Sequence, residues 1–265
     1  MEDLAGTVSF LLLWLFVLST AFLFHWYRLL KEQNARYQLM NEKLEQEVEA
    51  RTQRIEQVRD VSIFSLARLA ESRDKMTGRH LERIQAYSRL LAEALAQHPR
   101  YAGYIDREYL EDLERSSPLH DIGKVGIPDH ILLKAGRLTP SEFKTMKMHV
   151  LIGGDTLRRA EQNVKGESFL TLGKEIAYSH HERWDGGGYL RGLKGQQIPL
   201  SGRIVALADV YDALTSKRVY KEAADHAEAR ELIVREAGQH LDPEVVEAFL
   251  KVEPLFEHLQ TELAN

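Results

Sequence analysis

Cysteine is absent from this chain of 265 residues, which excludes disulfide frameworks, thiolate metal sites, iron–sulfur clusters and cysteine nucleophiles. A surplus of positive charge is absent as well, because 35 Lys and Arg residues stand against 40 Asp and Glu residues, for a formal net charge of -5. Without a global basic field, a nucleic-acid polymer has nothing general to bind, so we expect no such partner. The 11 histidines and the carboxylates remain as good metal ligands.

Charge of either sign is missing from residues 7–27. An apolar helix of about twenty residues is long enough to cross a hydrocarbon core of roughly 30 Å. Acidic residues precede the stretch and basic residues follow it: Glu2 and Asp3 before, Arg28, Lys31 and Arg36 after. This order favours an uncleaved anchor whose C-terminal side lies in the cytoplasm. We predict a short N-terminus and transmembrane helix over 1–27; the alternative is a buried core helix of a soluble protein.

A heptad pattern without proline or glycine occupies residues 30–58. Steps of four and three residues give two sets of seam positions: Asn34, Asn41, Val48 and Ile55 at a, and Leu30, Tyr37, Leu44, Arg51 and Val58 at d. Asparagine at an a position favours a two-stranded parallel coil in register. We predict a coiled-coil signalling linker over 28–62 that forms a parallel homodimer through 28–60. The alternative is a solvated helix that only spaces the next domain from the membrane.

Strand-type alternation is scarce after Val61, whereas helical spacing recurs, for example in ERIQAYSRLLAEALA and DPEVVEAFL. Thr139, Pro140 and Glu142 form a capping box with proline at the first helical position. Glycines cluster in GKVG and in WDGGGYLRG, so these two loops are expected to border a site. The pattern predicts an all-α domain over 63–265.

Histidine and aspartate recur in five short patterns: TGRH, LHDIGK, MKMHV, SHHERWDGGG and ADVYDAL. In His120–Asp121 and His180–His181 the two side chains are neighbours, and neighbours on a helix diverge by about 100°. Both members of a pair can bind the same metal ion only at a frayed helix end. Otherwise the two side chains bind two adjacent metal ions. Two metal ions a few ångströms apart, bridged by one carboxylate, satisfy this geometry.

The same patterns lie in three longer runs: HDIGKVGIPDHILLKAGRLTPSEF, HHERWDGGGYLRGLKGQQIPLSGRIVALADVYDALTSKRVYKEA and GQHLDPEVVEAFL. From about residue 65 to 250 the chain resembles the HD-GYP subgroup of HD-domain metal-dependent phosphohydrolases, which are bacterial cyclic di-GMP phosphodiesterases. The runs follow the family pattern in order and nearly without gaps. The resemblance implies an HD-type helical phosphohydrolase domain. With the anchor, it predicts a single-pass protein of the bacterial inner membrane whose catalytic domain is cytoplasmic.

The resemblance also implies the site residues. Asp121 would bridge two divalent ions, iron or manganese with nickel or zinc as competitors, and Asp121 and Lys124 would be the catalytic residues. Lys124, Arg218, Lys221 and Tyr189 would contact substrate, although solvated surface charges are the alternative for the three cations. One ion would take His80, His120 and Asp209, and the other His149, His180 and His181. The implied metal ligands are His80, His120, Asp121, His149, His180, His181 and Asp209.

Three positions depart from the family pattern. Leu190 stands where the name-giving tripeptide has proline, and Gly187 stands where threonine is usual, which predicts a more flexible loop without loss of a ligand. Met76 lies four residues before His80, where many members carry a glutamate that helps to hold a third metal. A thioether is a poor ligand for a hard divalent cation. Two ions are therefore expected rather than three.

The function expected from this resemblance is hydrolysis of cyclic di-GMP to pGpG, with GMP left open as a further product. Two Lewis acids would lower the pKa of a shared water, which attacks phosphorus in line. One alternative is a catalytically weak cyclic-dinucleotide receptor or scaffold that signals through protein partners. Another is an enzyme for a mixed cyclic dinucleotide. Diguanylate cyclases or effector proteins are further candidate partners. The roles of Asp74 and Asp212 stay open.

Overall fold

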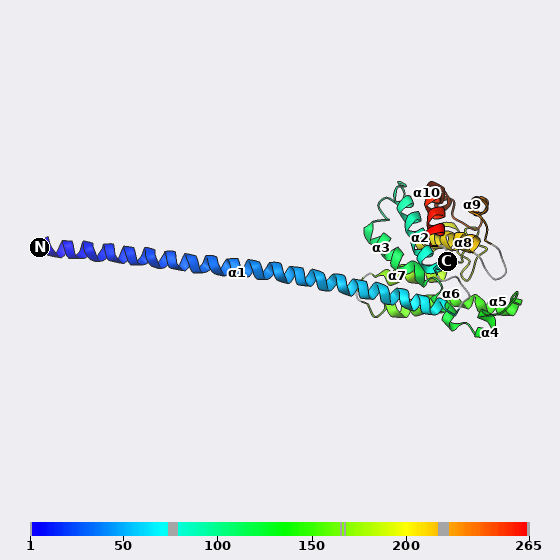
Figure 1. Ribbon diagram of the computed structural model, residues 1–265, viewed down its shortest axis with the longest axis horizontal. Coiled ribbons are helices and arrows are strands. Elements are labelled where there is room, and N and C mark those ends of the chain that lie inside the picture. Colours follow the sequence, from blue (N-terminus) through cyan, green and yellow to red (C-terminus); the bar gives the residue numbers. More distant parts are fainter. Residues whose placement is uncertain (1, 74–78, 165, 167, 217–222, 264–265) are drawn as a thin grey trace. The chain divides into compact units, whose positions relative to one another are not determined.

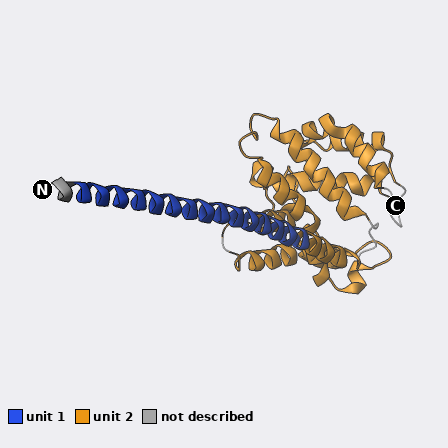
Figure 2. Cartoon of the chain, turned by 60° about the vertical axis from the view of Figure 1, so that its left-hand side comes forward, with its two compact units in different colours: residues 1–59 blue, residues 60–265 orange. Residues whose placement is uncertain are grey.

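The computed structural model of the chain describes residues 2–73, 79–164, 166, 168–216 and 223–263 (Figure 1). Within these ranges the secondary structure is helical, and the one β-type contact is an isolated bridge between Ala237 and Leu241. The predicted all-α fold is confirmed. The chain divides into two compact units, residues 1–59 and 60–265 (Figure 2).

Helix α1 (Glu2–Glu71) has no proline and runs without a break through the predicted anchor and linker. Its apolar side chains are exposed in unit 1, as Phe10 (62%) and Ile55 (69%) illustrate. By length and composition it is the one helix among the described residues that could cross a membrane. The boundaries 1–27, 28–62 and 63–265 stay predictions.

Unit 2 contains the remaining helices. They are α2 (His80–Ala96), α3 (Arg107–Ser116), η1 (Ser117–Leu119), η2 (Ile122–Gly126), α4 (Asp129–Leu132), α5 (Pro140–Met146), α6 (Met148–Glu161), α7 (Phe169–Ser179), η3 (Gly195–Gln197), α8 (Leu200–Thr215), α9 (His226–Arg235) and α10 (Pro243–Glu262).

Side-chain caps start several of these helices. The Thr139–Glu142 capping box that the sequence predicts at α5 is present, with Pro140 in the first turn. Asp225 and Glu228 form the same motif at α9. Each cap satisfies backbone N–H groups that have no partner within the helix. Local sequence therefore sets where these helices begin.

An aromatic core lies where α2, α8 and α10 meet. The ring of Tyr87 stacks on that of Phe256 with centroids 4.4 Å apart, and Tyr211 and Phe249 contact Phe256 edge-on. All four side chains are fully buried. Rings of this size supply much of the apolar area that a small domain buries. This core fixes α2 and α8, which also carry polar residues toward a second buried region.

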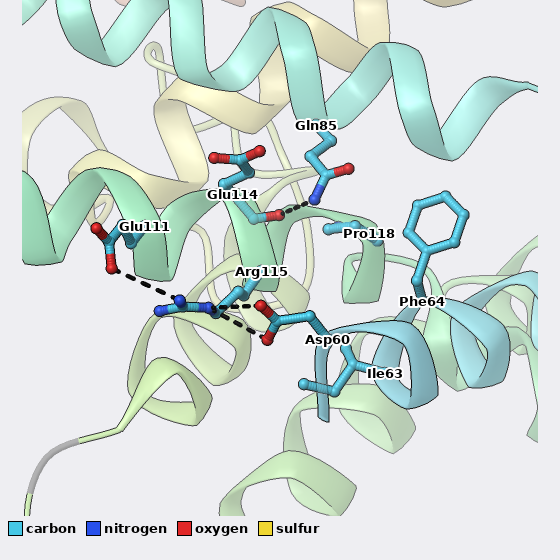
Figure 3. A pocket seen from close by; sticks show the side chains of 8 residues that line it. All are labelled: Asp60, Ile63, Phe64, Gln85, Glu111, Glu114, Arg115 and Pro118. Carbon is cyan, nitrogen blue, oxygen red and sulfur yellow. Dashed lines mark hydrogen bonds and ion pairs between the residues drawn. The ribbon is translucent and has the colours of Figure 1, made fainter. Parts of the chain in front are cut away.

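The last turns of α1 belong to unit 2. Ala67 packs in a small apolar cluster with Leu81, Leu119, Leu157 and Ala177, and Ile63 and Phe64 flank it. Asp60, one turn before Phe64, pairs with Arg115 of α3 (N···O 3.3 Å). Figure 3 shows Asp60, Ile63 and Phe64 of α1 around a cavity of about 250 Å³ beside α3 and η1. The end of α1 is thus part of the folded domain.

Candidate metal centre

The seven residues that the resemblance implies as metal ligands converge in unit 2. They come from the start of α2, the junction of η1 and η2, α6, the end of α7, and α8. Ligand atoms in each of two groups lie within 4.8 Å of one another. The groups are Asp121, His149, His180 and His181, and His80, His120 and Asp209. Asp121 belongs to the first group, and its Oδ2 atom also lies 3.4 Å from His120 Nε2 of the second, so this carboxylate reaches both groups.

Close backbone contact brings these segments together. A Cβ at Gly123 of η2 would lie 1.9 Å from the carbonyl oxygen of His149, so only glycine fits there. On the facing side, a Cβ at Gly153 of α6 would lie 3.1 Å from the backbone nitrogen of Gly123, which is a close but less severe approach. Because η2 follows His120 and Asp121 directly, this contact holds both residues against α6 and its His149. The glycines of the GKVG loop therefore have a packing role at the site.

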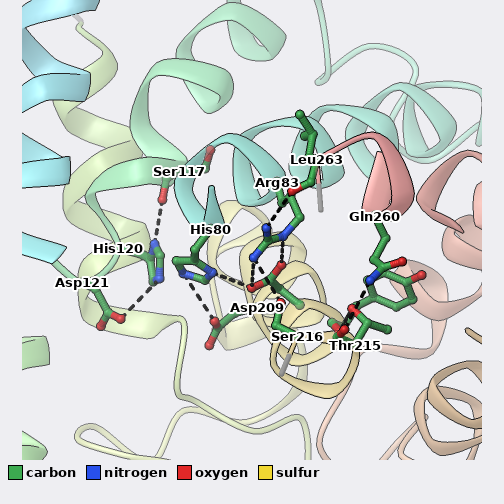
Figure 4. Close-up of polar contacts among 12 residues, drawn as sticks. His80, Arg83, Ser117, His120, Asp121, Asp209, Thr215, Ser216, Gln260 and Leu263 are labelled. Atoms are coloured by element: carbon green, nitrogen blue, oxygen red, sulfur yellow. Dashed lines mark hydrogen bonds and ion pairs between the residues drawn. The ribbon is translucent and has the colours of Figure 1, made fainter. Parts of the chain in front are cut away.

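Four of the imidazoles are oriented by hydrogen bonds at Nδ1. His80 donates to Asp212 Oδ2 (2.7 Å). The other three donate to backbone carbonyl oxygens: His120 to that of Ser117 (2.9 Å), His149 to that of Met146 (2.7 Å) and His180 to that of Ile176 (3.0 Å). Figure 4 shows the His120 ring held in this way by the carbonyl of Ser117. A proton on Nδ1 leaves the Nε2 lone pair available, as metal-binding histidines require.

The Nε2 atoms then face carboxylate oxygens across short gaps. From His149 and His180 the distances to Asp121 Oδ1 are 3.2 and 3.6 Å, and from His80 to Asp209 Oδ1 the distance is 4.0 Å. These buried Nε2 atoms and Asp121 Oδ1 have no hydrogen-bond partner. Lone pairs that face one another in a buried site are unfavourable unless a proton or a cation lies between them. The residues present therefore fit divalent metal ions.

Electrostatics support the same fit. Burial alone would raise the pKa of Asp121. The positive charges of Lys124 and His120 outweigh burial and hold this pKa well below its usual range. The Nζ atom of Lys124 lies 2.7 Å from Asp121 Oδ2. Burial also opposes protonation of His120, yet Asp121 raises the pKa of His120 to about 9. Burial lowers the pKa of His180, and it lowers the pKa of His181 to well below its usual range. Metals bind an ionised carboxylate and neutral imidazoles, so His180 and His181 match that state, whereas a metal would have to displace the proton that Asp121 stabilises on His120.

The residues implied for substrate contact are placed in part. The Tyr189 ring lies 4.9 Å from that of His181, and the ammonium of Lys147 lies 4.8 Å from the centre of the Tyr189 ring. Lys124 lies at the centre itself. Arg218, Lys221 and Met76 lie outside the described residues.

Asp212 is a residue whose role the sequence left open. Its carboxylate is 1% exposed and accepts hydrogen bonds from His80 Nδ1 and from Arg83 Nε (2.5 Å). Arg83, 3% exposed, also donates to Ser216 Oγ and to the carbonyl of Leu263 (Figure 4). Asp212 and Arg83 therefore set the orientation of His80. The spacing of Asp212 three residues after Asp209 was the available signal, since both lie on one face of α8.

Glu182, which directly follows His181 in the sequence, supports the loop that comes after it. Its side chain is 2% exposed and accepts from the backbone N–H groups of Arg191 (2.7 Å) and Leu193 (3.1 Å). It thereby fixes the backbone just after Tyr189 and Leu190. Asp185 holds the start of the same loop by accepting from the N–H of Gly187 (2.7 Å).

The fold and the centre define the class of protein. A match to the HD domain family extends over residues 65–245. A solved structure, a cyclic GMP-AMP-specific phosphodiesterase of Vibrio cholerae, superposes with a TM-score of 0.52 at 19% identity, over 78% of this chain and 53% of that one. That likeness concerns the fold. The chain belongs to the HD-domain family.

Two curated relatives from Vibrio cholerae narrow the comparison. A "Cyclic di-GMP phosphodiesterase" is 54% identical over 209 residues, which cover 79% of this chain and 42% of the relative. A "3'3'-cGAMP-specific phosphodiesterase 2" is 40% identical over 189 residues, which cover 71% and 34%. The resemblance to the HD-GYP subgroup is confirmed. The chain spans less than half the length of either relative.

Proposed function

We propose that this chain is a membrane-anchored, metal-dependent phosphodiesterase that hydrolyses cyclic di-GMP to pGpG, with GMP left open as a further product. The observation that carries the proposal is the convergence of inward-facing Nε2 atoms on Asp121 and Asp209 in a buried site. The name of the relative that is 54% identical supports the substrate. Complete ligand groups argue against a receptor that has lost its catalytic centre.

Two divalent ions, iron or manganese, are proposed for the centre. Asp121 would bridge them, with His80, His120 and Asp209 on one side and His149, His180 and His181 on the other. When bound, such a pair supplies Lewis acidity that activates water and stabilises charge on a phosphodiester. Before metal binds, Lys124 holds Asp121 in position through the contact of 2.7 Å. The positive charge of the two ions would attract the substrate phosphates.

Substrate would approach on the side of the loop that Glu182 and Asp185 fix. Tyr189 offers an aromatic face beside His181, and stacking on such a face suits a nucleobase. Lys124 lies within reach of a phosphate oxygen at the same centre. Arg218 and Lys221 are proposed as further phosphate contacts on the strength of the family resemblance.

Anchoring and assembly are part of the proposal. We place residues 1–27 in the bacterial inner membrane as a single pass, with the catalytic domain in the cytoplasm, and residues 28–60 in a parallel homodimer. The exposure of Val48 (55%) and Val58 (60%) on α1 supports a partner for that helix. Diguanylate cyclases or effector proteins are proposed as further partners.

A mixed cyclic dinucleotide is the second candidate substrate, because a relative that is 40% identical bears the name of a cGAMP-specific enzyme. A metal centre recognises the phosphodiester rather than the base, so it does not decide between the two substrates.

The test uses the purified full chain in detergent, loaded anaerobically with Fe²⁺ or with Mn²⁺. Cyclic di-GMP and 3'3'-cGAMP are supplied separately, and products are separated by chromatography. We expect pGpG from cyclic di-GMP, loss of activity on chelation and return of activity when the metal is restored. Faster hydrolysis of the mixed dinucleotide would favour the second candidate. Tight binding without hydrolysis by the loaded protein would favour a receptor and refute the enzyme.

A further inference from the structure

A carboxylate that the family resemblance did not single out faces the centre from the end of α1. Glu71 is the last residue of that helix and is partly buried. Just before it, Ala67 and Ala70 are each 3% exposed, so this turn is packed against the domain. Just after it, Arg73 donates to the carbonyls of Val125 and Ile127 and pairs with Asp129. The end of α1 is therefore held against η2, the segment that carries Lys124.

The Glu71 side chain lines a small cavity together with residues of the centre. The cavity has a volume of about 10 Å³, close to the space that a single water molecule needs. Apolar side chains close part of it, and the polar residues that line it are Glu71, His80, His120, Asp121 and Lys124. Glu71 Oε1 is buried and has no hydrogen-bond partner.

An unpartnered buried carboxylate oxygen costs free energy, so it needs a donor in the working protein. Lys124 is the ammonium that lines the same cavity, and it contacts Asp121 Oδ2 at 2.7 Å. In the proposed function the carboxylate oxygens of Asp121 coordinate metal ions. The lone pairs that bind the ions are then less available to Lys124, so the hydrogen bond between Lys124 and Asp121 is weakened. Glu71 is the other carboxylate among the described residues that line this cavity, which places it as an acceptor for Lys124.

We propose that Glu71 is a positioning residue that raises metal affinity: its carboxylate accepts from Lys124 when Asp121 binds the ions. This inference rests on the metal centre of the proposed function. It also places one supporting residue of that centre on α1. A displacement of this helix end is therefore expected to change metal affinity without touching a ligand.

Mn²⁺ binding to the metal-free full chain tests the inference. Affinity and the number of bound ions are measured by competition with a fluorescent chelator. Glu71→Gln removes the charge at constant shape, and it should weaken binding roughly 10–100-fold, the usual cost of losing an outer partner of a metal ligand. The number of ions at saturation should not change. Glu82→Gln is the matched control, because Glu82 also contacts α1, through Arg68, but does not line the cavity.

A double-mutant cycle with Lys124→Gln shows whether Glu71 acts through Lys124. In that background Glu71→Gln should have little further effect, since the donor is already gone. An equal effect in both backgrounds would overturn the inference. So would an unchanged affinity, or a loss of one bound ion, which would make Glu71 a ligand. If Glu71→Gln does not fold, Glu71→Asp, which withdraws the charge by one methylene, should weaken binding, and unchanged affinity would again overturn the inference.

The two proposals fail separately. A protein whose Mn²⁺ affinity depends on Glu71 but which hydrolyses no cyclic dinucleotide would refute the proposed function alone. An active protein whose Glu71→Gln variant binds Mn²⁺ like the parent would refute only the role of Glu71.

Discussion

Helices α2 and α8 each contribute to two buried regions of opposite character. One is the aromatic core, where Tyr87 and Tyr211 meet rings from α10. The other is the histidine centre, to which α2 brings His80 and α8 brings Asp209. Contacts between rings need nothing from outside the chain, whereas Nε2 and carboxylate atoms that face one another need a proton or a cation between them. The first region stabilises the fold, and the second is proposed to hold metal ions at some cost in stability.

The largest effect is expected at the carboxylate between the two ligand groups. Asp121→Ala should remove turnover and most metal binding, because it deletes the ligand shared by both ions. The loss should exceed the roughly 100-fold that removal of an outer partner costs. Metal analysis and turnover of the purified variant measure it. Appreciable hydrolysis by Asp121→Ala would show that the bridging role is wrong.

The aromatic core should respond in stability rather than in chemistry. Phe249 is fully buried against Tyr211 and Phe256, so Phe249→Ala should lower the free energy of unfolding by about 3–5 kcal/mol. Urea unfolding of the metal-free protein checks this value. The molecules that stay folded should bind as many ions as the parent. A change in that number would mean that the two regions are not independent.

Asp212 connects the two regions, and its replacement should affect both. Asp212→Asn should lower metal affinity roughly 10–100-fold, because His80 loses the acceptor that fixes its ring. It should also destabilise the fold, because the buried guanidinium of Arg83 loses its charged partner. Chelator competition and urea unfolding separate the two effects. Asp155→Asn, at a half-exposed carboxylate that accepts from Tyr178, is the control for which neither effect is expected.

Unit 1 offers the smallest expected changes, since its side chains lie on an exposed helix surface. Cysteine at Asn41 or Val48 should alter stability by less than about 0.5 kcal/mol and yet give crosslinked dimers in membranes. Cysteine at Glu45, which is not a seam position, should not crosslink. The absence of other cysteines makes each product unambiguous. Equal crosslinking at all three positions would remove the coiled-coil proposal.

The sequence predicted the helical fold because helical spacing and capping residues are local signals, and the capping box at Thr139 is where it was expected. The resemblance implied the seven residues that the structure brings together, although their role as ligands stays a prediction. Local patterns could not show which side chains support them. Asp212 and Glu182 act through contacts with a residue far along the chain or with backbone N–H groups, and Glu71 shares a cavity with residues about fifty positions later in the chain. Such neighbours meet only in the folded domain.

A metal titration tests the central claim most directly. Metal-free full chain receives Mn²⁺ in steps under anaerobic conditions, and the rate of pGpG formation from cyclic di-GMP is followed at each step. We predict no turnover without metal and a rate that rises to a plateau at two ions per chain. Turnover that does not depend on the metal, a plateau at three ions, or no turnover by the fully loaded protein would contradict the account.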